Sequence, residues 1–214
     1  MCGKTTSAYD AASLMDMLSA QYDRAYQGGF SGKAGKMMEW ITDMDGAILL
    51  FIQDAVRNPG LTPVFIAITV LGNGAVVWIL TAMGLLIPRG TRKTALACAA
   101  ALLLSLLINN AALKNIVGRI RPYDTIPGLV PLIGRPWDYS FPSGHTASSF
   151  AAAWVLYRRL PKRFGIPALV LASLIGVSRL YLGVHYPTDV LFGAVSGIGC
   201  GCMACVLVSA LARD

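Results

Sequence analysis

Long runs of apolar residues, separated by short polar connections, are the feature that most limits how this 214-residue chain can fold. A helix needs about 20 apolar residues to cross the hydrocarbon of a bilayer. With 55% hydrophobic and only 14% charged residues, the chain is also far more apolar than an average soluble domain. We therefore expect an all-α fold, a polytopic membrane helix bundle. Five long spans are predicted, at 62–88, 94–116, 144–160, 166–184 and 188–211.

A sixth, shorter apolar run covers 47–56 and has Asp45 and Asp54 at its edges. We interpret it as a short span rather than a helix lying in the interface, which gives about six helices in all. Residues 1–40 are mostly polar, and no apolar core follows Lys4, so a secretory signal is not expected. The predicted organisation is a cytoplasmic N-terminal extension at 1–40 and a membrane domain at 41–214.

Two short connections, 89–93 and 158–163, are rich in Lys and Arg. Because such residues concentrate in cytoplasmic loops, both connections should face the cytoplasm. Threading the spans from them places the 117–143 segment and the 184–188 turn together on the outer side. We expect a multi-pass protein of the plasma or inner membrane, with a site on the extracytoplasmic face. The net charge of +7 is interpreted as surface and anion-binding charge, and nucleic acid is not an expected partner.

Small and polar residues inside the spans indicate helix packing. Glycines recur every four positions on the last span, which favours close packing inside the bundle, with a homodimer face as the alternative. Asn109 and Asn110 should bond a neighbouring helix. The cysteines within 200–205 point in different directions on a helix and have no accompanying His or carboxylate, so we expect free thiols and no metal site. The glycines concerned are Gly193, Gly197 and Gly201.

Three cations are expected at span ends on the outer side. Lys114 and Arg121 are seven positions apart, which on a continuous helix places them on nearly one face, about 10 Å apart along the axis. Pro122 indicates that the span ends at Arg121. With Arg179, the group suits an anion, whereas snorkelling to lipid headgroups would explain a single cation.

Both histidines of the chain fall on the same side. Ser143 suits the N-cap of the following helix, whose free N–H groups bind anions, and His145 would project from the first turn. Pro187 suits the first turn of the last helix, which puts His185 just before it and Asp189 in its opening turn. A carboxylate near an imidazole fixes its tautomer and leaves the other nitrogen as a nucleophile. Alternatively, Asp189 only stabilises the helix N-terminus.

At these residues the sequence resembles the type 2 phosphatidic acid phosphatase superfamily, which also includes vanadium haloperoxidases and bacterial glucose-6-phosphatase-like enzymes. The resemblance covers roughly 47–211, with its three motifs in order. These are Lys114 with Arg121-Pro122, then Pro142-Ser143-Gly144-His145, then Ser178-Arg179 with His185 and Asp189.

The resemblance implies a role for each motif residue. His185 attacks phosphorus and becomes a phosphohistidine, Asp189 orients His185, and His145 protonates the leaving oxygen and then activates water. No cofactor or metal is implied, since phosphoryl transfer needs mainly positioning and charge neutralisation. The residues that bind the phosphate oxygens are Lys114, Arg121, Ser143, Gly144 and Arg179.

The resemblance, together with the apolar spans, implies a membrane lipid phosphatase that hydrolyses a phosphomonoester or diphosphate lipid. Undecaprenyl diphosphate and phosphatidylglycerol phosphate are the preferred substrates. Phosphatidate and lipid A phosphates stay open as alternatives, because the motifs bind only the phosphate that all four share. A serine hydrolase using Ser143 would need a G-x-S-x-G elbow, which the chain lacks. A non-enzymatic lipid or anion transporter would not need the His–Asp pair.

Overall fold

The computed structural model describes residues 33–211, which form helices, turns and loops with no strand among them. The chain divides into two compact units, Met1–Met44 and Asp45–Asp214. Of the first unit, the structure describes the beginning of helix α2 (Lys33–Phe51). Most of the expected 1–40 extension lies outside the described residues, so the boundary between extension and membrane domain stays a prediction.

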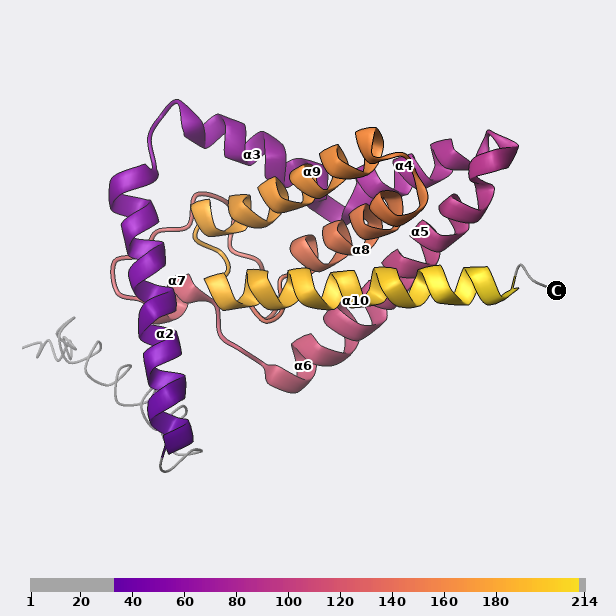
Figure 1. The fold of residues 1–214 in the computed structure, drawn as a ribbon. Helices are drawn as coiled ribbons and strands as arrows, with labels where there is room; N and C mark the ends of the chain where they lie inside the picture. Colours follow the sequence, from indigo (N-terminus) through magenta and orange to yellow (C-terminus); the bar gives the residue numbers. More distant parts are fainter. Residues whose placement is uncertain (1–32, 212–214) are drawn as a thin grey trace, which may run out of the picture. The chain divides into compact units, whose positions relative to one another are not determined.

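The second unit is a helix bundle (Figure 1). After the end of α2, its helices are η1 (Ile52–Val56), α3 (Leu61–Gly72), η2 (Asn73–Ala75), α4 (Val76–Leu86), η3 (Arg89–Thr91), α5 (Arg92–Ser105), η4 (Leu106–Leu113), α6 (Lys114–Val117), α7 (Pro122–Thr125), α8 (Gly144–Arg159), α9 (Lys162–Tyr181) and α10 (Pro187–Leu211). Of these, η1 and η4 have π-helical geometry, and η2 and η3 are 3₁₀ turns.

The membrane-spanning character of the bundle is confirmed by its helices. Four of the five expected spans are long and apolar enough to cross a bilayer, and large apolar side chains such as Leu80, Met83 and Val195 are exposed on them. The fifth, α8, has 16 residues, fewer than the roughly 20 of a full crossing. The short span at 47–56 stays a prediction. The four spans are Leu61–Leu86, Arg89–Thr125, Lys162–Tyr181 and Pro187–Leu211.

Helix α8 is the packing centre of the bundle, because its small side chains let α5, α9 and α10 contact it closely. Ala147 and Ala151 are fully buried. A Cβ added at Gly197 would lie 2.3 Å from the Ala147 carbonyl oxygen, and one at Gly201 would lie 2.8 Å from that of Ala151. The glycine repeat of α10 therefore serves packing within one chain, as predicted, while a homodimer stays a prediction.

The first long span is bent, where the sequence predicted one continuous helix over 62–88. Helices α3 and α4 meet at η2, in which Gly74 and Ala75 have positive φ angles of 55° and 56°. This conformation costs an L-residue such as alanine about 1–2 kcal/mol, so surrounding packing must hold the bend. The bend places Asn73 beside the start of α8, where it contacts His145.

Within the second long span, Arg89–Thr125, the continuous helix ends before Arg121. Helix α6 stops at Val117, and Gly118 adopts the left-handed conformation typical of helix C-termini, with φ 60°. Arg121 has extended backbone and precedes α7. The expectation that Lys114 and Arg121 share a face of one helix is therefore wrong, and a non-helical turn joins the two cations.

The connections between the helices lie at two opposite ends of the bundle (Figure 1). The α4–α5 and α8–α9 turns, which carry the basic connections 89–93 and 158–163, lie at one end. The end of α9, the start of α10 and the loop between α7 and α8 lie at the other. The predicted site residues belong to this second end.

Candidate active site

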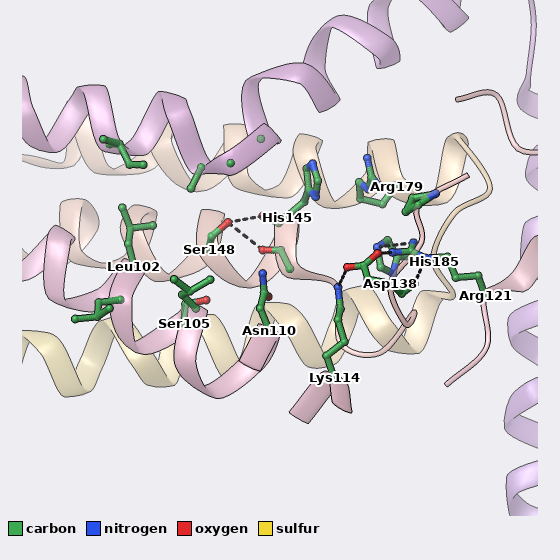
Figure 2. Close-up of a pocket in the computed structure, with 18 residues that line it drawn as sticks. Leu102, Ser105, Asn110, Lys114, Arg121, Asp138, His145, Ser148, Arg179 and His185 are labelled. Carbon is green, nitrogen blue, oxygen red and sulfur yellow. Dashed lines mark hydrogen bonds and ion pairs between the residues drawn. The ribbon is translucent and has the colours of Figure 1, made fainter. Parts of the chain in front are cut away.

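A cavity of about 480 Å³ opens between the η2 bend, α5 with η4, the start of α8 and the end of α9. Figure 2 shows that its lining changes character along its length. One part is apolar and includes Ile79, Leu102, Leu103 and Leu106. The other part carries charged and titratable side chains, namely Lys114, Arg121, Asp138, His145, Arg179 and His185. Such a cavity suits a ligand with an anionic head and an apolar tail.

Most of the predicted site residues meet at this cavity, although they come from three distant stretches of chain. Ser143 and Asp189 do not line it; both are fully buried in its wall. The residues that do line it are Lys114, Arg121, Gly144, His145, Arg179 and His185.

His185 presents its Nε2 to the charged part of the cavity. Arg121 Nη1 lies 3.3 Å from Nε2, and Asp189 Oδ2 lies 3.5 Å from Nδ1. Arginine only donates, so Nε2 must accept, which puts the proton of the neutral ring on Nδ1. Among residues 33–211, Nδ1 has no partner at ordinary hydrogen-bond geometry, so Asp189 acts on it as a nearby charge.

His185 is neutral at physiological pH. Burial, together with the charges of Arg121 and Arg179, lowers its pKa to about 3 against the opposing effect of Asp189. The ring therefore keeps an unprotonated Nε2, which is the form that a nitrogen nucleophile needs.

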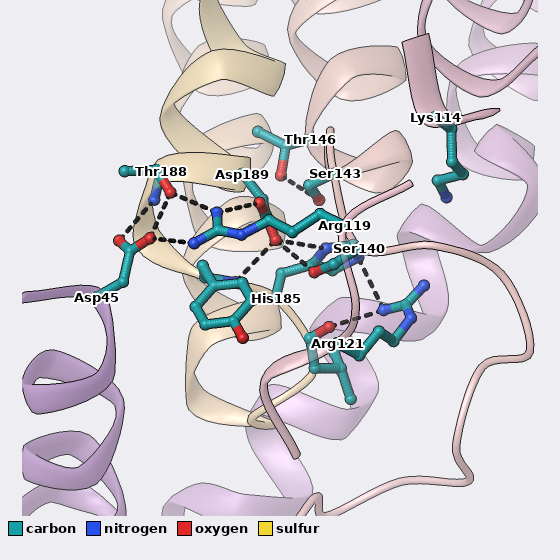
Figure 3. A network of polar contacts seen from close by, with 12 residues as sticks. Asp45, Lys114, Arg119, Arg121, Ser140, Ser143, Thr146, His185, Thr188 and Asp189 are labelled. Carbon is teal, nitrogen blue, oxygen red and sulfur yellow. Dashed lines mark hydrogen bonds and ion pairs between the residues drawn. The ribbon is translucent and has the colours of Figure 1, made fainter. Parts of the chain in front are cut away.

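Asp189 is held by three donors (Figure 3). Its Oδ2 accepts from Ser140 Oγ at 2.5 Å and from the Tyr186 backbone N–H at 2.9 Å. Its Oδ1 accepts from Arg119 Nη1 at 2.8 Å. A buried carboxylate with several donors stays charged and fixed in place.

Arg119 extends this contact to Asp45, at the start of the second unit (Figure 3). Its Nη2 lies 2.8 Å from Asp45 Oδ2, its Nη1 lies 2.7 Å from Thr188 Oγ1, and its guanidinium stacks 3.7 Å from the Tyr186 ring centroid. The Thr188 hydroxyl also donates to Asp45. We call Asp45, Arg119, Ser140, Thr188 and Asp189 the carboxylate network.

Sequence reasoning missed most of the carboxylate network. Asp45 was considered only as the edge of an apolar run, and Arg119 was passed over two positions before Arg121. No signal pointed to Asp45, because the predicted threading placed it at the inner edge of the 47–56 run, on the opposite side of the membrane from Arg119, whereas the structure pairs the two.

Fewer polar contacts hold the side chain of His145 in place. Its Nε2 lies 2.8 Å from Asn73 Oδ1 in the η2 bend. Because that oxygen only accepts, Nε2 carries a hydrogen. Gly72 makes room for the ring, since a Cβ there would lie 2.9 Å from His145 Cδ2 and 2.8 Å from Ile175. Sequence reasoning missed Asn73, because the bend was not predicted.

Ser143 occupies the N-cap position of α8, as predicted, but its side chain does not cap the helix within the described structure. Its hydroxyl accepts from Thr146 Oγ1 at 2.9 Å, and its backbone N–H donates to the Asp189 carbonyl at 3.2 Å. Ser143 thus ties the start of α8 to the start of α10.

Gly144 leaves space for the side chain of Asn110. A Cβ at Gly144 would lie 2.7 Å from Asn110 Oδ1, and Asn110 lines the cavity. Asn109 instead bonds Ser105 and Ser196, the structural role predicted for both asparagines. Asn110 therefore belongs to the site as well as to the bundle.

The three cations are not equivalent. Arg179 donates from Nη1 to Thr69 Oγ1 at 2.6 Å, and its buried Nε has no hydrogen-bond partner in the described part of the chain. Lys114 Nζ lies 2.5 Å from Asp138 Oδ2, and Arg121 Nη2 lies 2.6 Å from Asp138 Oδ1. Burial alone would raise the pKa of Asp138, but its bond to Lys114 and the charge of Arg121 lower it to about 2.

The chain is similar to known proteins. A family model described as the PAP2 superfamily matches residues 94–213. Decaprenylphosphoryl-5-phosphoribose phosphatase of Mycolicibacterium smegmatis is 36% identical over 154 residues, which cover 70% of this chain and 81% of that protein. Undecaprenyl-diphosphatase of Sulfolobus acidocaldarius is 32% identical over 121 residues, and the match spans 56% of this chain and 58% of that protein.

A solved structure supports the same fold. The first transmembrane PAP2 type phosphatidylglycerolphosphate phosphatase from Bacillus subtilis superposes with a TM-score of 0.64 at 28% identity. The similarity covers 96% of each chain, so it includes the helices that form the cavity.

Proposed function

Because the chain belongs to the PAP2 superfamily, we propose that it is a multi-pass membrane lipid phosphatase that works through a phosphohistidine on His185. The observation that carries the proposal is the cavity, where three cations and both histidines meet beside an apolar part. A phosphate head fits the first set of groups and a lipid tail fits the second.

The reaction uses the two histidines in turn. His185 Nε2 attacks phosphorus, the bond from phosphorus to the lipid oxygen breaks, and His145 gives a proton to the leaving oxygen. Water then attacks the phosphohistidine, His145 takes a proton from that water, and the electron pair of the P–N bond returns to Nε2. Asp189 stabilises the positive charge that develops on the His185 ring.

The phosphate is bound by charge and by backbone donors. Lys114, Arg121 and Arg179 neutralise the negative charge on the phosphate oxygens, which is the main electrostatic demand of phosphoryl transfer. The N–H groups at Gly144 and the start of α8 add a helix N-terminus, which favours anions. Ser143 contributes through the position of its backbone, since its side chain bonds Thr146 inside the wall.

The arrangement favours hydrolysis over the two alternatives. A serine hydrolase would need the Ser143 hydroxyl in the cavity, but Ser143 is fully buried. An anion transporter would not require a neutral imidazole beside a carboxylate that three donors hold. The placement of Asp189 behind His185 is therefore the feature that distinguishes a catalyst from a carrier.

The proposed location is the plasma or inner membrane, with the active site on the extracytoplasmic side. The support is the separation of the basic turns from the cavity at opposite ends of the bundle (Figure 1), because basic turns favour the cytoplasm.

The proposed substrates are undecaprenyl diphosphate or phosphatidylglycerol phosphate. Both join a phosphate to long apolar chains, and relatives named for each were found. Relatives are also named for other lipid phosphates, including lipid A, so the substrate is the part of the proposal that needs an experiment.

The test is phosphate release by the purified protein in detergent from undecaprenyl diphosphate, phosphatidylglycerol phosphate, phosphatidate and lipid A. We expect one or two of these lipids to be hydrolysed with clearly higher kcat/KM, and vanadate to inhibit competitively. A folded wild-type protein that hydrolyses none of the four would contradict the proposal.

A further inference from the structure

Asp138 places an anion on the cations that the proposed phosphate needs. Each of its carboxylate oxygens accepts from a different cation, Oδ2 from Lys114 and Oδ1 from Arg121 (Figure 2). Asp138 lies outside the three sequence motifs, yet it lines the same cavity as both histidines. Bonds between ionised partners are among the strongest hydrogen bonds in proteins, so the carboxylate is a serious competitor for any incoming anion.

The donors of Arg121 leave little room for two anions at once. A guanidinium has five N–H groups. Its Nε donates to the Asp138 carbonyl at 2.8 Å, and its Nη1 donates to the Val184 carbonyl at 2.7 Å and faces His185 Nε2. Nη2, which holds the carboxylate with one of its two N–H groups, is the remaining group. A phosphate that takes both N–H groups of Nη2 therefore needs the place that the Asp138 carboxylate occupies.

We propose that Asp138 is an internal competitor of phosphate, whose carboxylate leaves Lys114 and Arg121 when the substrate binds and returns when inorganic phosphate departs. The inference rests on the proposed function, because it assumes that phosphate binds these cations. Asp138 then determines specificity, since only an anion that binds more strongly than the carboxylate gains the site. It also favours release of the inorganic phosphate product.

The surroundings of Asp138 allow this exchange. Its side chain is 33% exposed, and the neighbouring Trp137 is 99% exposed, so neither is fixed in the core. The Arg121 Nε bond goes to the backbone of Asp138 and can persist while the side chain rotates. Rotation of one side chain toward water is therefore sufficient, with no displacement of a helix.

The experiment is equilibrium binding of inorganic phosphate to the purified protein in detergent, measured by calorimetry. Asp138→Asn keeps the shape of the side chain and removes its charge. We expect it to bind phosphate about tenfold more tightly than the wild type, which corresponds to about 1.4 kcal/mol. Asp124→Asn is the matched control, because Asp124 lies in the same outer segment, is exposed and pairs with Arg135 away from the cavity. We expect no change in the control.

Each outcome separates this inference from the proposed function. If the wild type binds phosphate and Asp138→Asn binds it equally or more weakly, Asp138 positions the cations and the competition is refuted. If neither protein binds phosphate and no lipid phosphate is hydrolysed, the proposed function is refuted, and so is this inference. Asp138→Ser, checked by the same titration and by thermal unfolding, replaces Asp138→Asn should that variant not fold.

Discussion

The two histidines share one cavity but are supported in opposite ways. His185 is almost fully buried, and its partner Asp189 is fixed by the carboxylate network that reaches back to Asp45. His145 is held by one side chain, Asn73, on a bent helix. The difference fits their proposed tasks, since a nucleophile benefits from one fixed orientation, whereas an acid that becomes a base must serve two steps.

The largest effect is expected at His185, the more deeply buried of the two histidines. His185→Gln removes the nucleophile, so kcat for phosphate release should fall at least about 10³-fold. The measurement is turnover of the best lipid in the panel, with thermal unfolding to verify the fold. Near-normal turnover by a folded variant would show that His185 is not the nucleophile, and the proposed difference in task between His185 and His145 would then be wrong.

His145→Ala should lower kcat by roughly 10²–10⁴-fold for a lipid whose leaving oxygen needs a proton. The loss should be much smaller for the first step with an aryl phosphate such as p-nitrophenyl phosphate, because its leaving group departs without an acid. The check is the rate of the burst of p-nitrophenol in pre-steady-state kinetics with substrate in excess. An equal loss for both substrates would argue against an acid at this position.

The carboxylate network should matter more for catalysis than a surface ion pair does. Arg119→Met leaves Asp45 and Asp189 buried without their shared cation, which destabilises a protein by about 3–5 kcal/mol when a buried pair is broken. Small misplacement of Asp189 should lower kcat about 10²-fold. Arg135→Met is the matched control, since Arg135 is mostly exposed, and neither its unfolding temperature nor its kcat should change.

Equal behaviour of the Arg119 and Arg135 variants would show that the carboxylate network has no role in positioning Asp189. Arg119→Lys adds a second check. It keeps the charge but loses the forked geometry, so it should recover stability more than it recovers kcat.

The smallest effect is expected at the single support of His145. Asn73→Leu removes the acceptor for Nε2 and should lower kcat about tenfold, the value of roughly one hydrogen bond. Asn73→Asp keeps an oxygen in the same place and should stay near wild type. A similar loss in both variants would mean that Asn73 serves the bend rather than the imidazole.

The motif residues could be found from the sequence, but the residues that hold them in position could not. The length of the apolar runs predicted the long helices, and position at predicted helix ends, together with the family resemblance, singled out Lys114, Arg121, His145, Arg179 and His185, which meet at the cavity. Pro187 even located Asp189 correctly in the first turn of α10.

What could not be predicted depends on tertiary contacts. The η2 bend depends on left-handed backbone at Ala75, a conformation that alanine disfavours. The bend, and with it the contact of Asn73 with His145, was therefore not predicted. Asp138 lies in a loop without periodicity, and its contacts with Lys114 and Arg121 arise only after the chain turns at Gly118. Asp45 meets Arg119 across a separation of 74 residues, which no local pattern reports.

The most direct test of the account is identification of the residue that carries phosphate during turnover. Protein mixed with ³²P-labelled lipid phosphate should be quenched in two portions, one in alkali, which preserves phosphohistidine, and one in acid, which preserves phosphoserine, and digested for mass spectrometry. The account predicts a phosphate on His185 in the wild type and none in His185→Gln. Label on Ser143, or turnover by an active wild type without any protein-bound phosphate, would contradict it.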